Sequence, residues 1–371
     1  MAFRFLLNRF CIFPFAVSTF NVSTRLLLII MEMNNLKLAD WWELAEKGKI
    51  LCTLCPRYCK IGEGQPGFCY IRQNHGGKLY TTGYGRPTGF AIDPVEKKPL
   101  NHFLPGSSIL SFGTAGCNLG CRFCQNWSIS KARLDEFNSL YASPEDVVKL
   151  AKQYNAPSIA FTYNDPTIFG EYVIDISKIA RSQGIKTVMV TAGYIDKQAR
   201  KDVYKYIDAA NVDLKGFTER FYFKLTFSHL KDVLDTLVWL KNETDVWLEI
   251  TTLLIPGEND SPDEVKEESE WILNNLGDSV PLHFTAFHPD FKMTDKERTP
   301  ERTLTTARSI AIKEGIKYCY LGNVYNREGQ TTYCPNCGTP LIKRDWHSVL
   351  SNKILNGKCY NCGTAIVGRF S

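Results

Sequence analysis

The sequence lacks a strong excess of charge of either sign. Its 44 Lys and Arg residues against 39 Asp and Glu give a formal net charge of +5, which is small for 371 residues. Because nucleic acids and acidic membrane surfaces are bound through concentrated basic patches, we expect no nucleic-acid or membrane partner. No tandem repeat or low-complexity stretch stands out, which excludes a solenoid array. With 44% hydrophobic and 22% charged residues, the composition is that of an ordinary globular protein.

A long apolar run is also absent from the N-terminal stretch, residues 1–33. This stretch contains Arg4, Arg9 and Arg25, no acidic residue before Glu32, and two apolar patches. Neither patch reaches the ~20 residues that a membrane-spanning helix needs.

Two interpretations fit these first residues. One is a cleaved targeting peptide. The other is translation of upstream sequence, with the true start at Met31 or Met33, where acidic and helix-forming residues first occur. We favour the second, because no clear apolar targeting core and cleavage site are present.

Cysteine is the informative residue type. Thirteen cysteines occur, and eleven of them fall into three tight groups. The odd total and the short C-x-x-C spacings argue against a secreted disulfide framework and favour thiolates gathered around metals in a reducing compartment. We therefore predict a cytoplasmic protein. Of the other two, Cys11 lies in the N-terminal stretch, and Cys319 is expected to be a small buried hydrophobe in a strand.

From Ser107 onwards, short β-branched runs alternate with amphipathic helical stretches. We predict strands at 107–113, 158–163, 186–191, 210–215, 246–255, 282–287 and 317–322. We predict helices at 143–154, 166–183, 196–207, 218–243 and 303–314, and one that starts at 261; capping boxes open those at 143 and 261. This alternation implies parallel strands joined by crossover helices. Seven such strands favour an α/β fold with a partial or nearly closed (β/α) barrel of the TIM type over a doubly wound sheet.

The length predicts appended modules, because 371 residues exceed the size at which one hydrophobic core usually stops growing. We divide the chain into a doubtful extension (1–33), an N-terminal cysteine-rich segment (34–105), the barrel (106–325) and a C-terminal module (326–371).

The central cysteines Cys117, Cys121 and Cys124 follow a C-x3-C-x2-C pattern at the end of the first barrel strand. In a parallel barrel, the carboxyl ends of the strands form the active face. Cubane iron–sulfur clusters normally take four thiolates, so a compact loop that offers three leaves one iron open for another ligand. Together with the aromatic Phe123, this spacing favours a [4Fe–4S] cluster over zinc, whose structural sites have four ligands.

This motif resembles that of radical S-adenosylmethionine (SAM) enzymes, and its surroundings resemble the branch that activates glycyl-radical enzymes such as pyruvate formate-lyase. More narrowly, the chain is similar to the radical SAM enzyme of the AmmeMemoRadiSam system, through the segments at 84–106, 124–130, 161–172 and 287–293. The resemblance covers about residues 50–370.

The resemblance implies that SAM binds the open iron through its amino and carboxylate groups and receives one electron from the reduced cluster. Cleavage would yield methionine and a 5′-deoxyadenosyl radical, which abstracts hydrogen from an unactivated C–H bond. It also implies a reduced flavodoxin- or ferredoxin-type electron donor.

The resemblance further implies where SAM binds. In the family, the second strand ends in a Gly-Gly-Glu-type turn that receives the SAM amino group, and here Asn164, Asp165 and Pro166 occupy that place. Asp165 is one methylene shorter than Glu, but it still accepts from an ammonium group. Asp165 and Pro166 also suit the start of a helix, and the two roles are compatible.

Further candidates follow the third and fourth strands. Thr191 and Gly193 flank Ala192, which replaces an Asn of the family pattern. Asp213 and Lys215 match the Asp-x-Lys of the activating enzymes, in which the Lys meets the SAM carboxylate and the Asp lies by the methionine end.

Phe123, Asn126 and His288 complete the predicted cofactor-binding set. His288 is expected at the rim of the same face, although a lone histidine is at least as often structural.

The tail has Cys334-x2-Cys337 and, after twenty-one residues, Cys359-x2-Cys362. Two such knuckles are the spacing of a zinc ribbon. Zinc fits best, although a rubredoxin-like iron would use the same ligands. We predict a structural Zn²⁺, because a tail this small needs a metal to fold.

The N-terminal group consists of Cys52, Cys55, Cys59 and Cys69. Its spacing fits either zinc or an auxiliary iron–sulfur cluster and does not decide between them.

We predict a radical SAM enzyme that abstracts hydrogen from a protein or peptide substrate, by analogy with the activating enzymes. The alternative within the enzyme class is the radical modification of a small molecule. The alternative outside it is a zinc-binding interaction protein, in which all three cysteine groups hold zinc.

Overall fold

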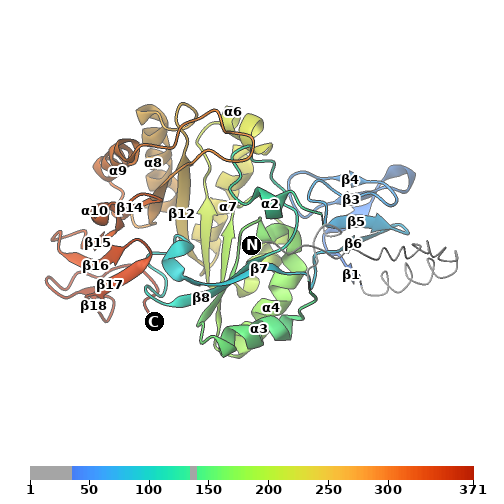
Figure 1. Ribbon diagram of the computed structural model, residues 1–371, viewed down its shortest axis with the longest axis horizontal. Helices are drawn as coiled ribbons and strands as arrows, with labels where there is room; N and C mark the ends of the chain where they lie inside the picture. The colour runs from blue at the N-terminus through green and yellow to red at the C-terminus, as the bar shows by residue number, and fades with distance from the viewer. Residues whose placement is uncertain (1–35, 134–139) are drawn as a thin grey trace, which may run out of the picture. The chain divides into compact units, whose positions relative to one another are not determined.

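An eight-stranded sheet forms the centre of the computed structural model (Figure 1). Its spatial order follows the chain from β7 to β14; β8 to β14 are parallel, and β7 is antiparallel to β8. The strands are β7 (Thr88–Pro94), β8 (Ser108–Gly113), β9 (Ser158–Phe161), β10 (Lys186–Thr191), β11 (Ala209–Asp213), β12 (Trp247–Leu254), β13 (Leu282–Ala286) and β14 (Cys319–Gly322). The predicted seven parallel strands and the partial (β/α) barrel are confirmed.

The structure describes residues 36–133 and 140–371, and the extension predicted at 1–33 lies outside them. Residues 37–371 form one compact unit. Within these described ranges, no helix combines the length and the apolar composition that crossing a bilayer requires.

Helices connect the parallel strands: α3 (Pro144–Gln153), α4 (Gly170–Ser182), α5 (Ala199–Val203), α7 (Leu230–Glu243), α8 (Pro262–Leu276) and α9 (Glu301–Glu314). The capping box predicted at α3 is confirmed, since Ser143 Oγ accepts from Asp146 N–H and the Asp146 carboxylate accepts from Ser143 N–H. The capping box predicted at α8 is wrong in one of its two hydrogen bonds. Ser261 Oγ accepts from Glu264 N–H, but the Glu264 carboxylate accepts from Phe217 N–H in the loop after β11.

The single helix predicted at 218–243 is also wrong. The chain forms α6 (Glu219–Phe221), a π-helical turn η6 (Tyr222–Thr226) and then α7, with Phe227 left-handed at φ 56°. The break frees two carbonyl groups: those of Leu225 and Thr226 accept from Arg122 and Gly120 in the cysteine loop. A continuous α-helix would have used these carbonyls itself, so the break serves the cysteine loop.

Short elements flank the sheet in the sequence. The N-terminal segment has two small sheets, β1 (Lys37–Leu38) with β6 (Lys78–Thr81) and β5 (Arg72–His75), and β2 (Trp42–Leu44) with β3 (Ile50–Cys52) and β4 (Lys60–Ile61). The tail has β15 (Thr332–Tyr333), β16 (Pro340–Asp345) and β17 (Ser348–Asn352) in one sheet, and β18 (Ile354–Leu355) with β19 (Lys358–Cys359) in another. The short helical turns are η1 (Glu46–Gly48), η2 (Val95–Lys97), α2 (Trp127–Ser130), η4 (Pro166–Phe169), η5 (Tyr204–Tyr206) and α10 (Arg327–Gln330).

The edge strand β7 was not predicted. It ends at Pro94, contains Gly89 at φ 70°, and shifts its pairing with β8 between Thr88 and Ala91. Glycine and proline are tolerated at an edge strand with a bulge, but both weaken the strand pattern in the sequence.

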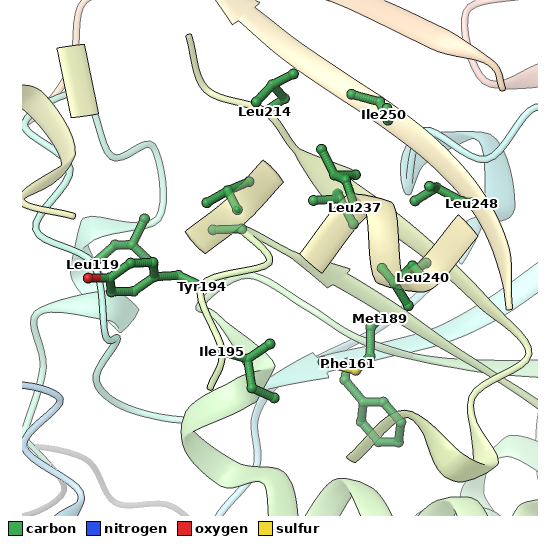
Figure 2. Close-up of a cluster of buried hydrophobic side chains, with 14 of the residues drawn as sticks. Leu119, Phe161, Met189, Tyr194, Ile195, Leu214, Leu237, Leu240, Leu248 and Ile250 are labelled. Atoms are coloured by element: carbon green, nitrogen blue, oxygen red, sulfur yellow. The ribbon is translucent and has the colours of Figure 1, made fainter. Parts of the chain in front are cut away.

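One apolar cluster joins the sheet, the helices and the cysteine loop (Figure 2). Met189 of β10 and Ile250 of β12 are buried together with Leu237 and Leu240 of α7. Leu119 of the cysteine loop belongs to the same cluster. Because burial contributes roughly 25 cal/mol per Å² of apolar surface, it helps to hold this loop onto the barrel.

The buried carboxyl group of Glu268 on α8 makes the free energy of unfolding depend on pH. It accepts a hydrogen bond from Thr252, and burial raises its pKa from 4.5 to about 8. The unfolded chain loses this proton near pH 4.5, whereas the folded chain keeps it until about pH 8. The free energy of unfolding therefore falls as the pH rises through this window.

We predict that Glu268→Gln removes this loss and stabilises the protein by roughly 3 kcal/mol at pH 7, at about 1.4 kcal/mol per unit of pKa difference. Urea unfolding at pH 5 and pH 8.5 measures the effect, which should nearly vanish at the lower pH. The exposed neighbour Glu267→Gln is the control and should change little at either pH. A Glu268→Gln variant less stable than the parent at pH 8.5 would contradict the prediction.

Candidate active site

The cysteine loop runs from the end of β8 to α2 without regular secondary structure. Cys121 is buried, and Cys117 and Cys124 are partly buried. Cys117 Sγ accepts from Leu119 N–H at 3.4 Å, and Cys124 Sγ lies 3.1 Å from Ser130 Oγ. Burial raises the pKa of Cys117 to about 11 and that of Cys121 to about 12. The pocket therefore disfavours free thiolates, which a bound metal centre would stabilise.

Asn164, at the end of β9, fixes the start of this loop. Its Oδ1 accepts from Thr114 N–H at 3.0 Å, and its Nδ2 donates to Thr114 Oγ1 at 3.1 Å and to Gly116 O at 2.8 Å. Gly116 has φ 86°, and a Cβ there would lie 2.0 Å from Cys69 O, so only glycine fits. The buried amide of Asn164 is thus occupied by the cysteine loop itself.

Asp165 links the ends of β9 and β10. It caps η4 by accepting from Thr167 N–H at 2.9 Å, and it also accepts from Ala192 N–H at 2.8 Å and from Thr191 Oγ1 at 3.1 Å. Burial raises the pKa of Asp165, and these donors oppose the increase. The structure brings the candidates Asp165 and Thr191 into contact, and Pro166 opens η4 as a helix start would require.

Asp213 and Lys215 form an ion pair at the end of β11, with 2.8 Å between Oδ2 and Nζ. Burial lowers the pKa of Lys215, but the Asp213 carboxylate and the Cys121 thiolate outweigh it and raise the pKa above its ordinary value. Thr251 lies opposite Asp213 in the register of β11 and β12. Its buried hydroxyl has no hydrogen-bond partner within the described residues.

A cavity of about 450 Å³ lies on the inner side of the partial barrel, between the strands and the cysteine loop. Of the predicted residues, Cys121, Phe123, Cys124, Asn126, Asp213 and Lys215 line it. The others, Cys117, Asn164, Asp165, Pro166, Thr191, Gly193 and His288, are not part of its wall. The cavity wall thus contains two of the central thiols and a partly buried ion pair.

Four weaker candidates take different positions. Phe123 is buried against Phe221, with ring centroids 5.7 Å apart, and Asn126 Nδ2 donates to Tyr163 O at 3.0 Å. Gly193 has φ 66°. His288 is 53% exposed and lies 2.9 Å from Gln125 Nε2, so it stands at the rim rather than inside the cavity.

The sequence analysis missed the far wall of the cavity, which the tail supplies through Arg344, Trp346 and His347. Arg344 is buried, donates to Asn101 O at 2.7 Å and approaches Glu96 at 3.4 Å. No motif marks these residues. Their role depends on contacts between segments more than 200 positions apart, which local patterns do not record.

A second missed pair lies on the barrel strands. His283 of β13 lines the cavity, and its Nε2 is 2.7 Å from Oε2 of Glu249 in β12. The Glu249 carboxylate also accepts from Asn101 N–H and His102 N–H. Hydrogen bonds from His283 help to lower the pKa of Glu249 against the opposing effect of burial.

The two outer cysteine groups differ in geometry. In the tail, Cys334 Sγ lies 3.6 Å from Cys362 Sγ and Cys337 Sγ lies 3.8 Å from Cys359 Sγ, with all four within 4.8 Å of one another. The predicted four-cysteine cluster is confirmed. In the part of the chain that the structure describes, no other His, Cys, Asp or Glu side chains gather three ligand atoms this closely, and the N-terminal cysteines are no exception.

Comparisons with known proteins agree with this site. The family description "Radical SAM superfamily" matches residues 112–269, which include the whole cysteine loop. An uncharacterized protein of Methanocaldococcus jannaschii is 43% identical over 333 residues, which cover 88% of this chain and 98% of that protein. The pyruvate formate-lyase-activating enzyme of Clostridium pasteurianum is 22% identical over 183 residues, 47% of this chain and 72% of that enzyme. A solved domain of such an activating enzyme from Bacteroides vulgatus shows 20% identity and a TM-score of 0.39, over 44% of this chain and 98% of the domain.

We predict that Asn164→Ala loosens the cysteine loop, because three buried hydrogen-bonding groups of Thr114 and Gly116 lose their partner. The expected cost is about 2–3 kcal/mol in the free energy of unfolding. The iron retained after anaerobic reconstitution should fall as well. Asn274→Ala, on the exposed side of α8, is the matched control. Unchanged stability and iron content in Asn164→Ala would contradict the positioning role.

Proposed function

Since this chain belongs to the radical SAM superfamily, we propose that it uses SAM cleavage to abstract hydrogen from a protein or peptide substrate. The observation that carries the proposal is the three-thiol loop at the carboxyl edge of the parallel strands, beside a cavity with a partly buried Asp213–Lys215 pair. When bound, a [4Fe–4S] cluster and SAM supply a 5′-deoxyadenosyl radical that attacks unactivated C–H bonds.

The donor set of the loop fits a cluster of this type. Cys117, Cys121 and Cys124 offer three thiols, which leaves one coordination position of a cubane for another ligand. The Leu119 N–H group donates to Cys117 Sγ, and the positive charge of Lys215 lowers the pKa of Cys121. Both interactions stabilise negative charge on sulfur, which ligation of iron requires.

The polar groups of the cavity fit SAM. We assign the SAM carboxylate to Lys215, because the Asp213 carboxylate raises the pKa of this partly buried ammonium group and keeps it charged. Asp213 and the unpartnered Thr251 hydroxyl stand next to it and offer an acceptor and a donor to the methionine end. Asp165 and Thr191 lie behind the wall of the cavity, where their hydrogen bonds join the end of β9 to the end of β10.

The rim of the cavity favours a large substrate. At about 450 Å³ the cavity lies within the range for small-molecule ligands, which suits SAM. Exposed aromatic side chains stand nearby: Trp127 stacks on Phe291 at 5.7 Å, and Tyr325 lies 6.3 Å from Trp346 of the cavity wall. Aromatic residues are enriched at protein interfaces. The name of the Clostridium relative likewise gives pyruvate formate-lyase, a protein, as what it activates.

The tail fits a structural zinc ion. With a Zn–S distance of about 2.3 Å, the sulfur atoms of a tetrahedral tetrathiolate site lie about 3.8 Å apart. The observed separations of 3.6 Å and 3.8 Å match this spacing. We therefore propose Zn²⁺ at the tail, and a reduced flavodoxin- or ferredoxin-type protein as the electron donor.

Replacement of Cys117, Cys121 and Cys124 by Ala tests the reaction. We predict that this variant forms no 5′-deoxyadenosine from SAM after anaerobic reconstitution and reduction with dithionite, while the parent does. The tail zinc should remain, which checks that the variant is folded, and Cys319→Ala, outside the three groups, should retain activity. Formation of 5′-deoxyadenosine by the triple variant would refute the assignment, and a parent with zinc but no iron or sulfide would favour an interaction protein.

Lys215→Met tests the SAM site separately. Because a charge-assisted contact contributes about 1.5–3 kcal/mol, we predict a rise in the KM for SAM of about tenfold or more, compared at equal iron content after reconstitution. Lys224→Met, an exposed lysine of η6, is the control. An unchanged KM for SAM in Lys215→Met would remove Lys215 from the SAM site.

A further inference from the structure

Four thiols of the N-terminal segment lie together outside the SAM site. Cys52 ends β3, Cys55 and Cys59 follow in the next turn, and Cys69 returns after β4. Cys52, Cys55 and Cys69 are buried and Cys59 is partly buried. We propose that these four cysteines bind an iron–sulfur cluster, and not a zinc ion.

The backbone brings the four residues together. Cys52 N–H donates to Cys59 O at 3.0 Å, and Tyr58 N–H donates to Cys55 O at 3.1 Å in the turn between them. A Cβ at Gly67, two residues before Cys69, would lie 3.7 Å from Cys59 Cβ. Cys59 therefore lies beside both the end of β3 and the turn that leads to Cys69.

The spacing of the sulfur atoms separates a cluster from a single ion. Around one zinc ion all four would lie about 3.8 Å apart, as the tail cysteines nearly do. In the described ranges, no three of the N-terminal sulfur atoms lie within 4.8 Å of one another. A cluster holds each thiolate on a different iron at its outside, so its cysteines stand wider apart. The central cysteines of the SAM site likewise form no group of three within this distance.

The surroundings suit a buried, negatively charged centre. The backbone N–H groups of Arg57, Phe68, Ile71 and Arg72 lie near the sulfur atoms of Cys55, Cys59 and Cys69 and would donate to thiolates there. The buried guanidinium of Arg72, paired with Glu171 at 2.9 Å, adds a positive charge beside Cys69. Such hydrogen bonds and charges stabilise iron–sulfur clusters and tune their potentials.

The proposed site adjoins the cysteine loop of the SAM site. Cys69 O packs on Gly116, the residue before Cys117, closely enough to exclude a Cβ. Arg57, between Cys55 and Cys59, donates to the carbonyl of Asn118 in the same loop. A cluster here would therefore be the immediate neighbour of the cluster that binds SAM.

Metal and sulfide analysis of the parent protein tests the inference without any substitution. After anaerobic reconstitution with iron and sulfide, we expect iron and acid-labile sulfide clearly above the about four per chain that a single [4Fe–4S] centre holds, together with one zinc. About four iron atoms or fewer, with two zinc ions per chain, would overturn the proposal.

Two variants locate the second cluster. Cys117→Ala with Cys121→Ala and Cys124→Ala should retain iron and sulfide in equal amounts, with an electron paramagnetic resonance signal that SAM does not alter. The double variant with Cys55→Ala and Cys59→Ala should lose the iron and sulfide of the second cluster. It should keep the SAM-responsive signal and the zinc. A triple variant free of iron and sulfide but carrying two zinc ions refutes the inference. If the parent instead forms no 5′-deoxyadenosine while the triple variant keeps its iron and sulfide, the proposed reaction fails and the second cluster stands.

Discussion

A loop that presents three thiols to one cluster cannot pair the hydrogen-bonding groups of its own backbone, and other parts of the fold supply the partners. The cysteine loop has no helix or strand of its own, so its buried N–H and C=O groups need partners elsewhere. Asn164 binds its beginning, the carbonyls of η6 bind its middle, and Arg57 and Lys131 bind the carbonyls of Asn118 and Leu119. Parts of the chain from the N-terminal segment to η6 therefore converge on the cysteine loop, and the loss of any of these contacts would disturb the residues that hold the cluster.

Much of this architecture could be predicted because it follows from local rules. β-branched runs at regular spacing predict parallel strands, and parallel strands bring their carboxyl ends to one edge. That is why Asp213 and Lys215, which directly follow an apolar run, are beside Cys121 and Cys124 in the structure. The zinc-type spacing of the tail was equally visible, because ligand spacing within a knuckle is a local property.

What could not be predicted depends on distant partners. Periodicity shows the apolar face of 218–243 but not that Gly120 needs the carbonyl of Thr226, which interrupts the helix. The composition of 326–371 indicates a metal-bound module but not that Arg344 reaches Asn101 and Glu96 across the barrel opening. Asp165 was predicted to start a helix and to face a ligand; it caps η4, and its further donors, Thr191 and Ala192, come from the next strand. In each case the deciding hydrogen bond joins residues that sequence patterns treat separately.

The position of the tail has a consequence for biosynthesis. His102 Nδ1 lies 2.7 Å from Val367 O, and Arg369 N–H donates to His102 O, so nearly the last residues of the chain hold the segment before β8. Arg344 and Trp346 complete the cavity only when β16 has formed. Because β16 follows the barrel in the sequence, it is synthesised after the barrel, which lacks one cavity wall until then. The cavity is therefore complete only after the barrel and the C-terminal module have both been synthesised and have folded together.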